Sequence, residues 1–261
     1  MRMIPLLLAL AAAPFASAAA AADPAVEEVQ ACARRNLPET SARQSIVLEA
    51  IDASGTGQRI EAELLWRRGK QDRSQVLVRV ERPMDLRGSA FLALERESGY
   101  DLFSYLPSLQ KVRRLQGSAI SGSLFGTDFS YEDFQRLQTA AEGTAVTRLP
   151  DADLDGRPAF VIAAVPAADS GSAYQRIVSW IDRETCVLLR ADLEAGGGRV
   201  AKQLLADPAQ VRAVGTRHVP HRVTLEDRDE NTRTTLTIEK IELDVPLSDS
   251  LFSESALTKG R

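Results

Sequence analysis

Few side chains in this sequence have the types and spacing that catalysis or metal binding requires. His218 and His221 are three residues apart on an expected strand, so they face opposite sides, whereas zinc needs its ligands on one side. Asp151 opens a segment like a calcium-binding loop, but the twelfth position is Ile162, which supplies no carboxylate. The sequence holds no phosphate-binding glycine loop and no nucleophile elbow. We therefore expect no enzyme activity, no metal and no cofactor.

A polar, glycine-rich block in the middle of the chain has the most unusual composition. It starts with a Tyr-Leu-Pro segment, continues with basic residues, and ends with an acidic segment after a Ser/Gly-rich loop. Its members are Tyr105, Leu106, Pro107, Lys111, Arg113, Arg114, Gly126, Asp128, Tyr131, Glu132 and Asp133.

Two interpretations of this block stay open. In the structural one, the basic side chains protect a sheet edge from pairing, and the acidic ones belong to a turn and the cap of a short helix. In the functional one, residues 118–126 form a mobile lid that carries Leu124 and Phe125. The charged groups would then set the positions of the lid or contact a membrane partner.

The block resembles a signature of the LolA-like family of periplasmic outer-membrane lipoprotein-sorting proteins, in which a leucine replaces Phe134. The similarity extends from Cys32 through Pro38 to the tail between Phe252 and Leu257. The resemblance implies an incomplete, half-open β-barrel covered by short helices, with an apolar cavity between the two. It also implies a carrier, expected to be a monomer, whose cargo is a lipid or lipoprotein and whose membrane contact is transient. Family members are often encoded beside RND-type exporters, so an inner-membrane exporter of this kind is an expected partner.

The beginning of the chain reads as a secretory signal peptide. Residues 1–22 contain Arg2, an apolar run and a series of small residues before Asp23. The apolar run has about half of the roughly 20 residues that span a bilayer. We expect cleavage of residues 1–22, a single lipid-binding domain in residues 23–261, and export to the periplasm. A formal net charge of −4 argues against nucleic acid as a partner.

Alternating apolar and polar residues predict a mainly β domain. Strand-like segments with turn residues between them follow one another at short intervals, and about ten such strands predict an antiparallel meander that curls or closes. The expected strands are 60–66, 75–81, 89–95, 100–106, 158–165, 174–182, 187–194, 199–205, 219–227, 232–239 and 241–245. A short helix is expected at 25–35 and another at the tail. The inner face can be filled by side chains or left open for a ligand. The candidate cavity residues are Ile60, Leu64, Trp66, Val76, Val78, Val80, Leu124 and Phe125.

The two cysteines, Cys32 and Cys186, are candidates for a disulfide in an oxidising compartment. The alternative is a pair of unbonded buried thiols.

The export signal, the curled sheet, the lack of a catalytic set and the family resemblance together predict a carrier. It would bind the acyl chains of a lipid or lipoprotein in an apolar cavity and move it toward the outer membrane. The alternative is an accessory subunit that docks to an RND-type exporter without transporting anything.

Overall fold

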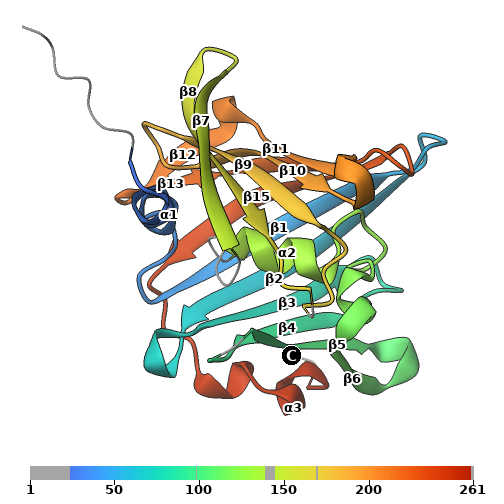
Figure 1. Cartoon of the computed structure of the whole chain (residues 1–261). Helices are drawn as coiled ribbons and strands as arrows, with labels where there is room; N and C mark the ends of the chain where they lie inside the picture. The colour runs from blue at the N-terminus through green and yellow to red at the C-terminus, as the bar shows by residue number, and fades with distance from the viewer. Residues whose placement is uncertain (1–23, 98, 139–144, 169, 260–261) are drawn as a thin grey trace, which may run out of the picture.

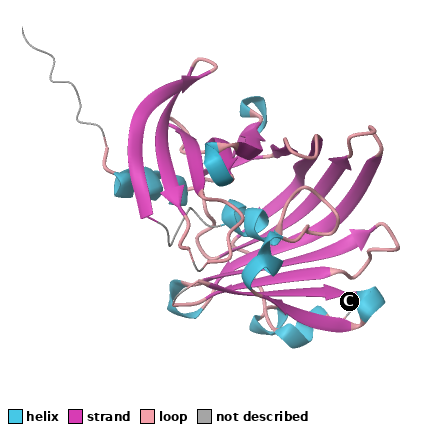
Figure 2. Cartoon of the chain, turned by 45° about the vertical axis from the view of Figure 1, so that its right-hand side comes forward, coloured by secondary structure: helices cyan, strands magenta, loops and turns pink. Residues whose placement is uncertain are grey.

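The computed structural model describes residues 24–97, 99–138, 145–168 and 170–259. The expected signal peptide, residues 1–22, lies outside these ranges. Within them the protein is mainly β, as predicted, and its main feature is one open antiparallel sheet of 13 strands. Figure 2 shows the strands bending around a central helical segment without closing into a complete barrel.

The sheet consists of two antiparallel halves. The N-terminal half is a simple meander in which each strand pairs with the next: β1 (Ser41–Ile51), β2 (Gly57–Arg68), β3 (Ser74–Arg82), β4 (Ala90–Glu95), β5 (Tyr100–Leu106) and β6 (Lys111–Leu115). The C-terminal half contains β7 (Ala145–Leu154), β8 (Arg157–Val165), β9 (Arg176–Asp182), β10 (Leu188–Glu194), β11 (Val200–Ala206), β14 (Arg222–Asp227) and β15 (Thr232–Leu243).

The first and last strands of the sheet sequence, β1 and β15, join the two halves. Leu48 pairs with Leu236 of β15 on one side and with Ile60 of β2 on the other, and all three side chains are buried. The prediction of a single meander was therefore wrong in topology, because the last strand, β15, pairs with the first strand, β1. The edges of the open sheet are β6 and β7.

Three departures from the predicted strands have local causes. A separate hairpin, β12 (Val211–Val214) and β13 (Arg217–Pro220), takes up the start of the predicted 219–227 strand. The predicted strands 232–239 and 241–245 merge into the single strand β15, which ends at Leu243 and absorbs a register shift opposite Ser45 and Ile46. The segment at Asp151 is part of β7, and the turn that follows is centred on Asp155 and Gly156, both with positive φ.

Short helices cover the two faces of the sheet. The helices are α1 (Val26–Arg34), α2 (Tyr131–Gln138) and α3 (Glu254–Leu257). Figure 1 shows α2 inside the curve, α3 beneath the N-terminal half, and α1 beside the β12–β13 hairpin. The predicted N-terminal and C-terminal helices are thus confirmed.

Apolar side chains on both faces of β2–β5 explain why the alternation is imperfect there. Ile60, Ala62, Leu64 and Trp66 are buried on the inner face, as their spacing predicts. Leu65 points the other way and packs with Phe252 and Leu257 of the C-terminal segment. No helix of the described ranges is long and apolar enough to span a bilayer.

The joint between β1 and β15 predicts one cooperative unfolding unit. Leu48→Ala removes a fully buried side chain at that joint and is expected to lower the free energy of unfolding by about 2–5 kcal/mol. Urea unfolding followed by circular dichroism measures the change. Glu49→Ala, at the next and partly exposed position of β1, is the control and should cost far less. Two separate transitions in the Leu48 variant would contradict the single unit.

Candidate functional site

The inner face of the sheet is filled in one half and hollow in the other. In the N-terminal half, α2 and the loop before it bring Leu124, Phe125, Phe129, Tyr131 and Phe134 into the core. The Phe91 ring of β4 lies 5.2 Å from that of Tyr131 and 6.3 Å from that of Phe134, measured between centroids. These aromatic contacts leave that half packed shut.

A cavity of about 240 Å³ lies against the C-terminal half of the inner face. Its sheet wall is mostly apolar and includes Leu64, Ile177, Ala191, Leu193, Leu204 and Leu236. Small side chains such as Ala164, Ser179 and Ala191 alternate with larger ones along these strands, so the wall leaves volume that a uniform row of leucines would fill.

The other wall of the cavity comes from outside the main sheet. We call it the cover and define it as residues 26–38 together with the β12–β13 hairpin, residues 211–220. Gln30, Ala33, Asn36, Leu37 and Pro38 line the cavity from the first segment. His218, Val219 and Pro220 line it from the hairpin.

The predicted cavity residues divide between the two halves. Leu64 lines the cavity. Ile60, Trp66, Val76, Val78, Val80, Leu124 and Phe125 are buried in the adjoining packed core. Sequence reasoning missed the lining positions of β8–β11, β14 and β15. The mixture of small and branched apolar residues on those strands, as at Ala164 and Ile162, is the sequence signal that could have indicated a cavity wall there.

The acidic residues of the polar block anchor α2 inside the half-barrel. Asp128 accepts hydrogen bonds from the hydroxyl groups of Thr232 and Thr234 on β15, the latter at 2.5 Å. Glu132 accepts from the Ser172 hydroxyl and, at 3.2 Å, from the backbone N–H of Ala173. The side chains at positions 132 and 133 are buried, and each carboxylate has partners, as burial of charge requires.

Asp133 caps α2 and connects it to β11 and to the loop before β9. Its Oδ2 accepts from the Ser130 N–H at 2.9 Å, while the Ser130 hydroxyl accepts from the Asp133 N–H at 3.0 Å. The Tyr174 hydroxyl donates to Oδ1 at 2.7 Å, and Lys202 Nζ of β11 lies 3.5 Å from Oδ2. Asp133 also lines the cavity, where it marks the boundary between the packed and hollow halves.

The basic residues of the block lie apart from the acidic ones, on the edge strand β6. Lys111, Arg113 and Arg114 are exposed there, and Arg114 pairs with Asp101 of β5. Tyr131 has its hydroxyl near Ser104 and Arg113; burial raises the pKa of the phenol, and these two neighbours oppose the rise. Tyr105, Leu106 and Pro107 form the end of β5 and the turn that leads to β6. This arrangement favours the structural interpretation of the block.

Phe125 and Gly126 form the tight turn of the loop, with φ of 55° and 81°. The Phe125 side chain is 6% exposed and Leu124 is fully buried, so both belong to the packed half. A non-glycine residue at positive φ is costly, and the surrounding packing maintains it.

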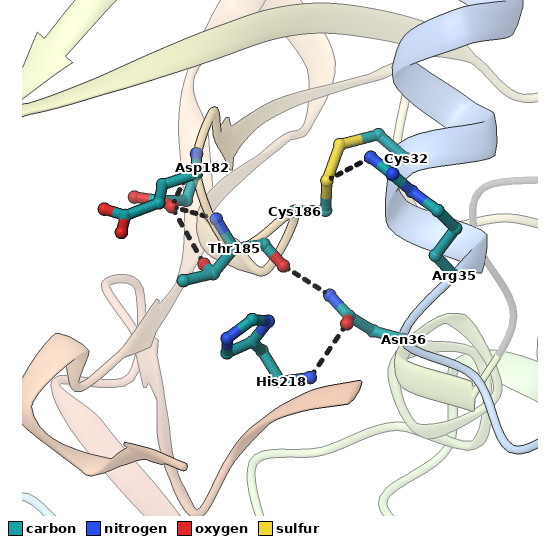
Figure 3. The surroundings of a disulfide bond; sticks show 8 residues. Cys32, Arg35, Asn36, Asp182, Thr185, Cys186 and His218 are labelled. Atoms are coloured by element: carbon teal, nitrogen blue, oxygen red, sulfur yellow. Dashed lines mark hydrogen bonds between the residues drawn. A yellow bond between two sulfur atoms is a disulfide. The ribbon is translucent and has the colours of Figure 1, made fainter. Parts of the chain in front are cut away.

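A disulfide joins Cys32 of α1 to Cys186 in the β9–β10 turn, and the Cα atoms are 5.3 Å apart. Figure 3 shows the surroundings of this bond. The Asn36 side chain donates to the carbonyl of Thr185 at 2.8 Å and accepts from the His218 N–H at 2.9 Å. The Arg35 guanidinium donates to Cys186 Sγ at 3.0 Å. The bond and Asn36 therefore tie the cover to the sheet.

Asp182 shapes the turn that carries Cys186. Its Oδ1 accepts from the N–H groups of Glu184 and Thr185 and from the Thr185 hydroxyl, and Oδ2 accepts from Arg157 at 2.7 Å. Burial acts to raise the pKa of this carboxyl, but the bonds from Arg157 and Thr185 outweigh it, and the pKa lies below the ordinary 3.8. Among the described residues, no cluster of three or more His, Cys, Asp and Glu side chains could hold a metal.

Because Phe125 is buried, its substitution is expected to lower the stability of the fold rather than to change the movement of a lid. Phe125→Ala is expected to lower the free energy of unfolding by about 3–5 kcal/mol, because it opens a cavity in the packed half. Urea unfolding measures this, with the half-exposed Leu109→Ala as the control. Unchanged stability together with faster ligand exchange would instead favour a mobile lid.

Asp182 predicts a pH-dependent contribution to stability. Because its folded-state pKa is depressed, the carboxylate stabilises the fold above the unfolded pKa, and this contribution is lost as pH falls through the folded one. Asp182→Asn should lower the free energy of unfolding at neutral pH by about 1–3 kcal/mol. The deficit should shrink below about pH 4. Urea titrations across this pH range test it against the exposed Asp85→Asn; a constant deficit at all pH values would contradict the assignment.

Comparisons with known proteins agree with this architecture. A family model whose description reads "uncharacterized protein" matches residues 72–259. No curated protein matches the chain. Three solved structures share the fold over most of their length.

A DUF1329 family protein from Desulfovibrio piger has a TM-score of 0.80 at 24% identity, covering 89% of this chain and 98% of its own. A putative outer membrane lipoprotein-sorting protein domain from Vibrio parahaemolyticus has a TM-score of 0.80 at 20% identity, with coverages of 89% and 97%. A LolA superfamily protein from Nitrosomonas europaea has a TM-score of 0.71 at 17% identity, with coverages of 90% and 100%. The chain therefore belongs to the family that this model defines, and its fold is LolA-like.

Proposed function

We propose that the protein is a periplasmic, non-enzymatic carrier that binds an acyl chain of a lipid or lipoprotein in the cavity. The observation that carries the proposal is an apolar hollow of about 240 Å³ on one half of an inner face whose other half is packed shut. The fold is shared with a lipoprotein-sorting domain and a LolA superfamily protein, which supports the same class of cargo.

The energetics of an acyl chain explain why such a hollow is useful. At about 0.8 kcal/mol per buried CH₂, a chain of common length in water is unfavourable by on the order of 10 kcal/mol. Crossing an aqueous compartment requires an apolar surface that shields the chain. The cavity lies slightly below the roughly 300–1,000 Å³ of typical ligand sites, so its volume is closer to one chain than to several.

The location and organisation of the protein are part of the proposal. Residues 1–22 would direct export and be removed, and residues 23–261 would act as one lipid-binding domain. An RND-type exporter in the inner membrane would donate or accept the cargo. Because the cavity wall is largely apolar, the binding it offers is non-directional, which suits a carrier that must also release its cargo.

The first experiment is lipid mass spectrometry of gently purified protein together with binding of a fluorescent fatty acid. Acyl species that copurify, and saturable displacement of them by the fluorescent fatty acid, are the expected results. Protein that is free of lipid and fails to bind the fluorescent fatty acid would overturn the proposal.

Two variants in which leucine replaces a buried alanine distinguish a hollow interior from a packed one. Ala191→Leu extends into the cavity and is expected to weaken fatty-acid binding about tenfold or more, while the free energy of unfolding changes by less than about 1 kcal/mol. Ala93→Leu, in the packed half, should cost about 1–3 kcal/mol of stability and leave affinity unchanged. The measurements are fluorescence titration and urea unfolding. Equal affinities for the Ala191 variant and the parent protein would place the ligand elsewhere.

A further inference from the structure

The cover of the cavity is structurally separate from the sheet that it closes. The β12–β13 hairpin forms its own two-stranded sheet, and residues 26–38 precede the first strand. The two parts of the cover are joined to each other, because Arg217 donates to the Leu37 carbonyl at 2.8 Å and the His218 N–H donates to Asn36. The two parts therefore form one continuous wall of the cavity.

The hairpin runs directly between β11 and β14 and packs Val219 in their core, whereas residues 26–38 are fastened to the C-terminal strands by separate contacts. Val29 of α1 packs on Ile162 and Ile181, and Asn36 donates to the Thr185 carbonyl. Apart from the main chain, which continues from residue 38 into β1, the covalent connection of this segment is the disulfide, whose Cys186 also lines the cavity. A helix of nine residues is shorter than the about 12–15 that a marginally stable isolated helix needs, so α1 depends on these attachments.

The environment of the sulfur atoms is asymmetric. Arg35 donates to Cys186 Sγ at 3.0 Å, and its guanidinium would stabilise a thiolate formed there. The cysteines are buried, but the Arg35 side chain next to them is exposed, so the bond lies close beneath the surface. Burial slows exchange with small thiols, while the guanidinium makes Cys186 the better leaving group.

We propose that Cys32–Cys186 is a thiol–disulfide exchange site for a dithiol reductant, and that its reduction releases the cover from the β9–β10 turn and opens the cavity. The consequence for cargo rests on the proposed function; the movement of the cover does not.

The exchange reaction balances as a two-electron transfer from the dithiol to the protein. One thiolate of the reductant attacks Cys32 Sγ, the S–S bond breaks, and its electron pair goes to Cys186 Sγ beside Arg35. The second thiolate of the reductant then attacks its own sulfur in the mixed disulfide and releases Cys32 as a thiolate. The protein ends as a dithiol after its sulfurs are protonated, and the reductant ends as a disulfide.

Hydrogen–deuterium exchange tests the release of the cover without any cargo. Three samples are compared: the oxidised protein, the same protein kept in excess dithiothreitol, and the Cys32→Ser/Cys186→Ser variant. Amides of residues 26–38 and 211–220 should exchange about tenfold faster or more in the latter two, with β10 and β11 as the unchanged reference. Equal exchange in the oxidised and reduced protein overturns the proposal. Near-UV circular dichroism verifies folding, and reduced parent protein decides the test if the double variant does not fold.

Stopped-flow association of a fluorescent fatty acid tests the opening of the cavity. Association should be about tenfold faster or more with reduced protein. Equal association rates for oxidised and reduced protein, despite a loosened cover, would overturn the claim that the disulfide controls access to the cavity. A loosened cover in protein that binds no fatty acid in either state would refute the proposed function and leave the exchange site standing.

The role of Arg35 has a matched control in the preceding residue, Arg34. Arg35→Gln should slow reduction of the disulfide by dithiothreitol several-fold. In the Arg34→Gln variant, the disulfide should be reduced as fast as in the parent protein. Thiol release measured over time gives both rates. Equal rates for the two variants would overturn the assignment of Cys186 as the leaving group.

Discussion

The pairing of β1 with β15 is the interaction on which the rest of the structure depends. It merges two antiparallel halves into one sheet, and the inner face becomes wider than either half could offer. Such a face must be covered, because exposed apolar surface is unfavourable in water. The described helices are short, and the aromatic side chains of α2 pack against β4 in the N-terminal half. The hollow in the C-terminal half therefore arises because the sheet is wide, whereas α2 and its preceding loop are too small to cover all of it.

Polar contacts with the C-terminal half hold α2 and its preceding loop in place. Buried carboxylates are costly without partners, and the buried Glu132 and Asp133 bond to residues 172–174 and to the cap of α2. The half-buried Asp128 bonds to threonine hydroxyls of β15. These bonds are directional, unlike apolar contacts, so they fix where α2 sits. A sliding or swinging α2 would break several buried bonds at once. The position of the hollow is therefore set by hydrogen bonds, although its wall is apolar.

The sequence predicted the elements better than their arrangement. Alternation at Ile60–Trp66 and Val76–Val80 correctly placed an inward face, because the period of a strand is a local property. Whether that face is packed or hollow depends on which distant segment lies against it. The loop at Leu124 and Phe125 fills the space in front of β2–β4, and nothing local to those strands reveals this.

The predicted strands did not include β1, residues 41–51, so its pairing with β15 was not predicted either. Sequence reasoning could list Cys32 and Cys186 as a possible pair, but not the role of α1 and β13 as a wall of the cavity. That role arises from tertiary contacts such as those of Asn36 with Thr185 and His218.

A carrier of the proposed kind must bind strongly enough to shield its cargo and weakly enough to release it, and we infer that the two walls of this cavity serve these two requirements separately. Hydrophobic binding scales with the apolar area removed from water, so partial withdrawal of one wall weakens it in proportion. The sheet wall is held by a continuous ladder of backbone hydrogen bonds and cannot withdraw without unfolding. The cover lies outside that ladder, and its first segment is attached across the cavity by Val29, Asn36 and the disulfide. Under the proposed function, we expect a change in affinity at constant fold to come from the cover, and its attachment at Cys186 and Thr185 to affect how readily cargo leaves.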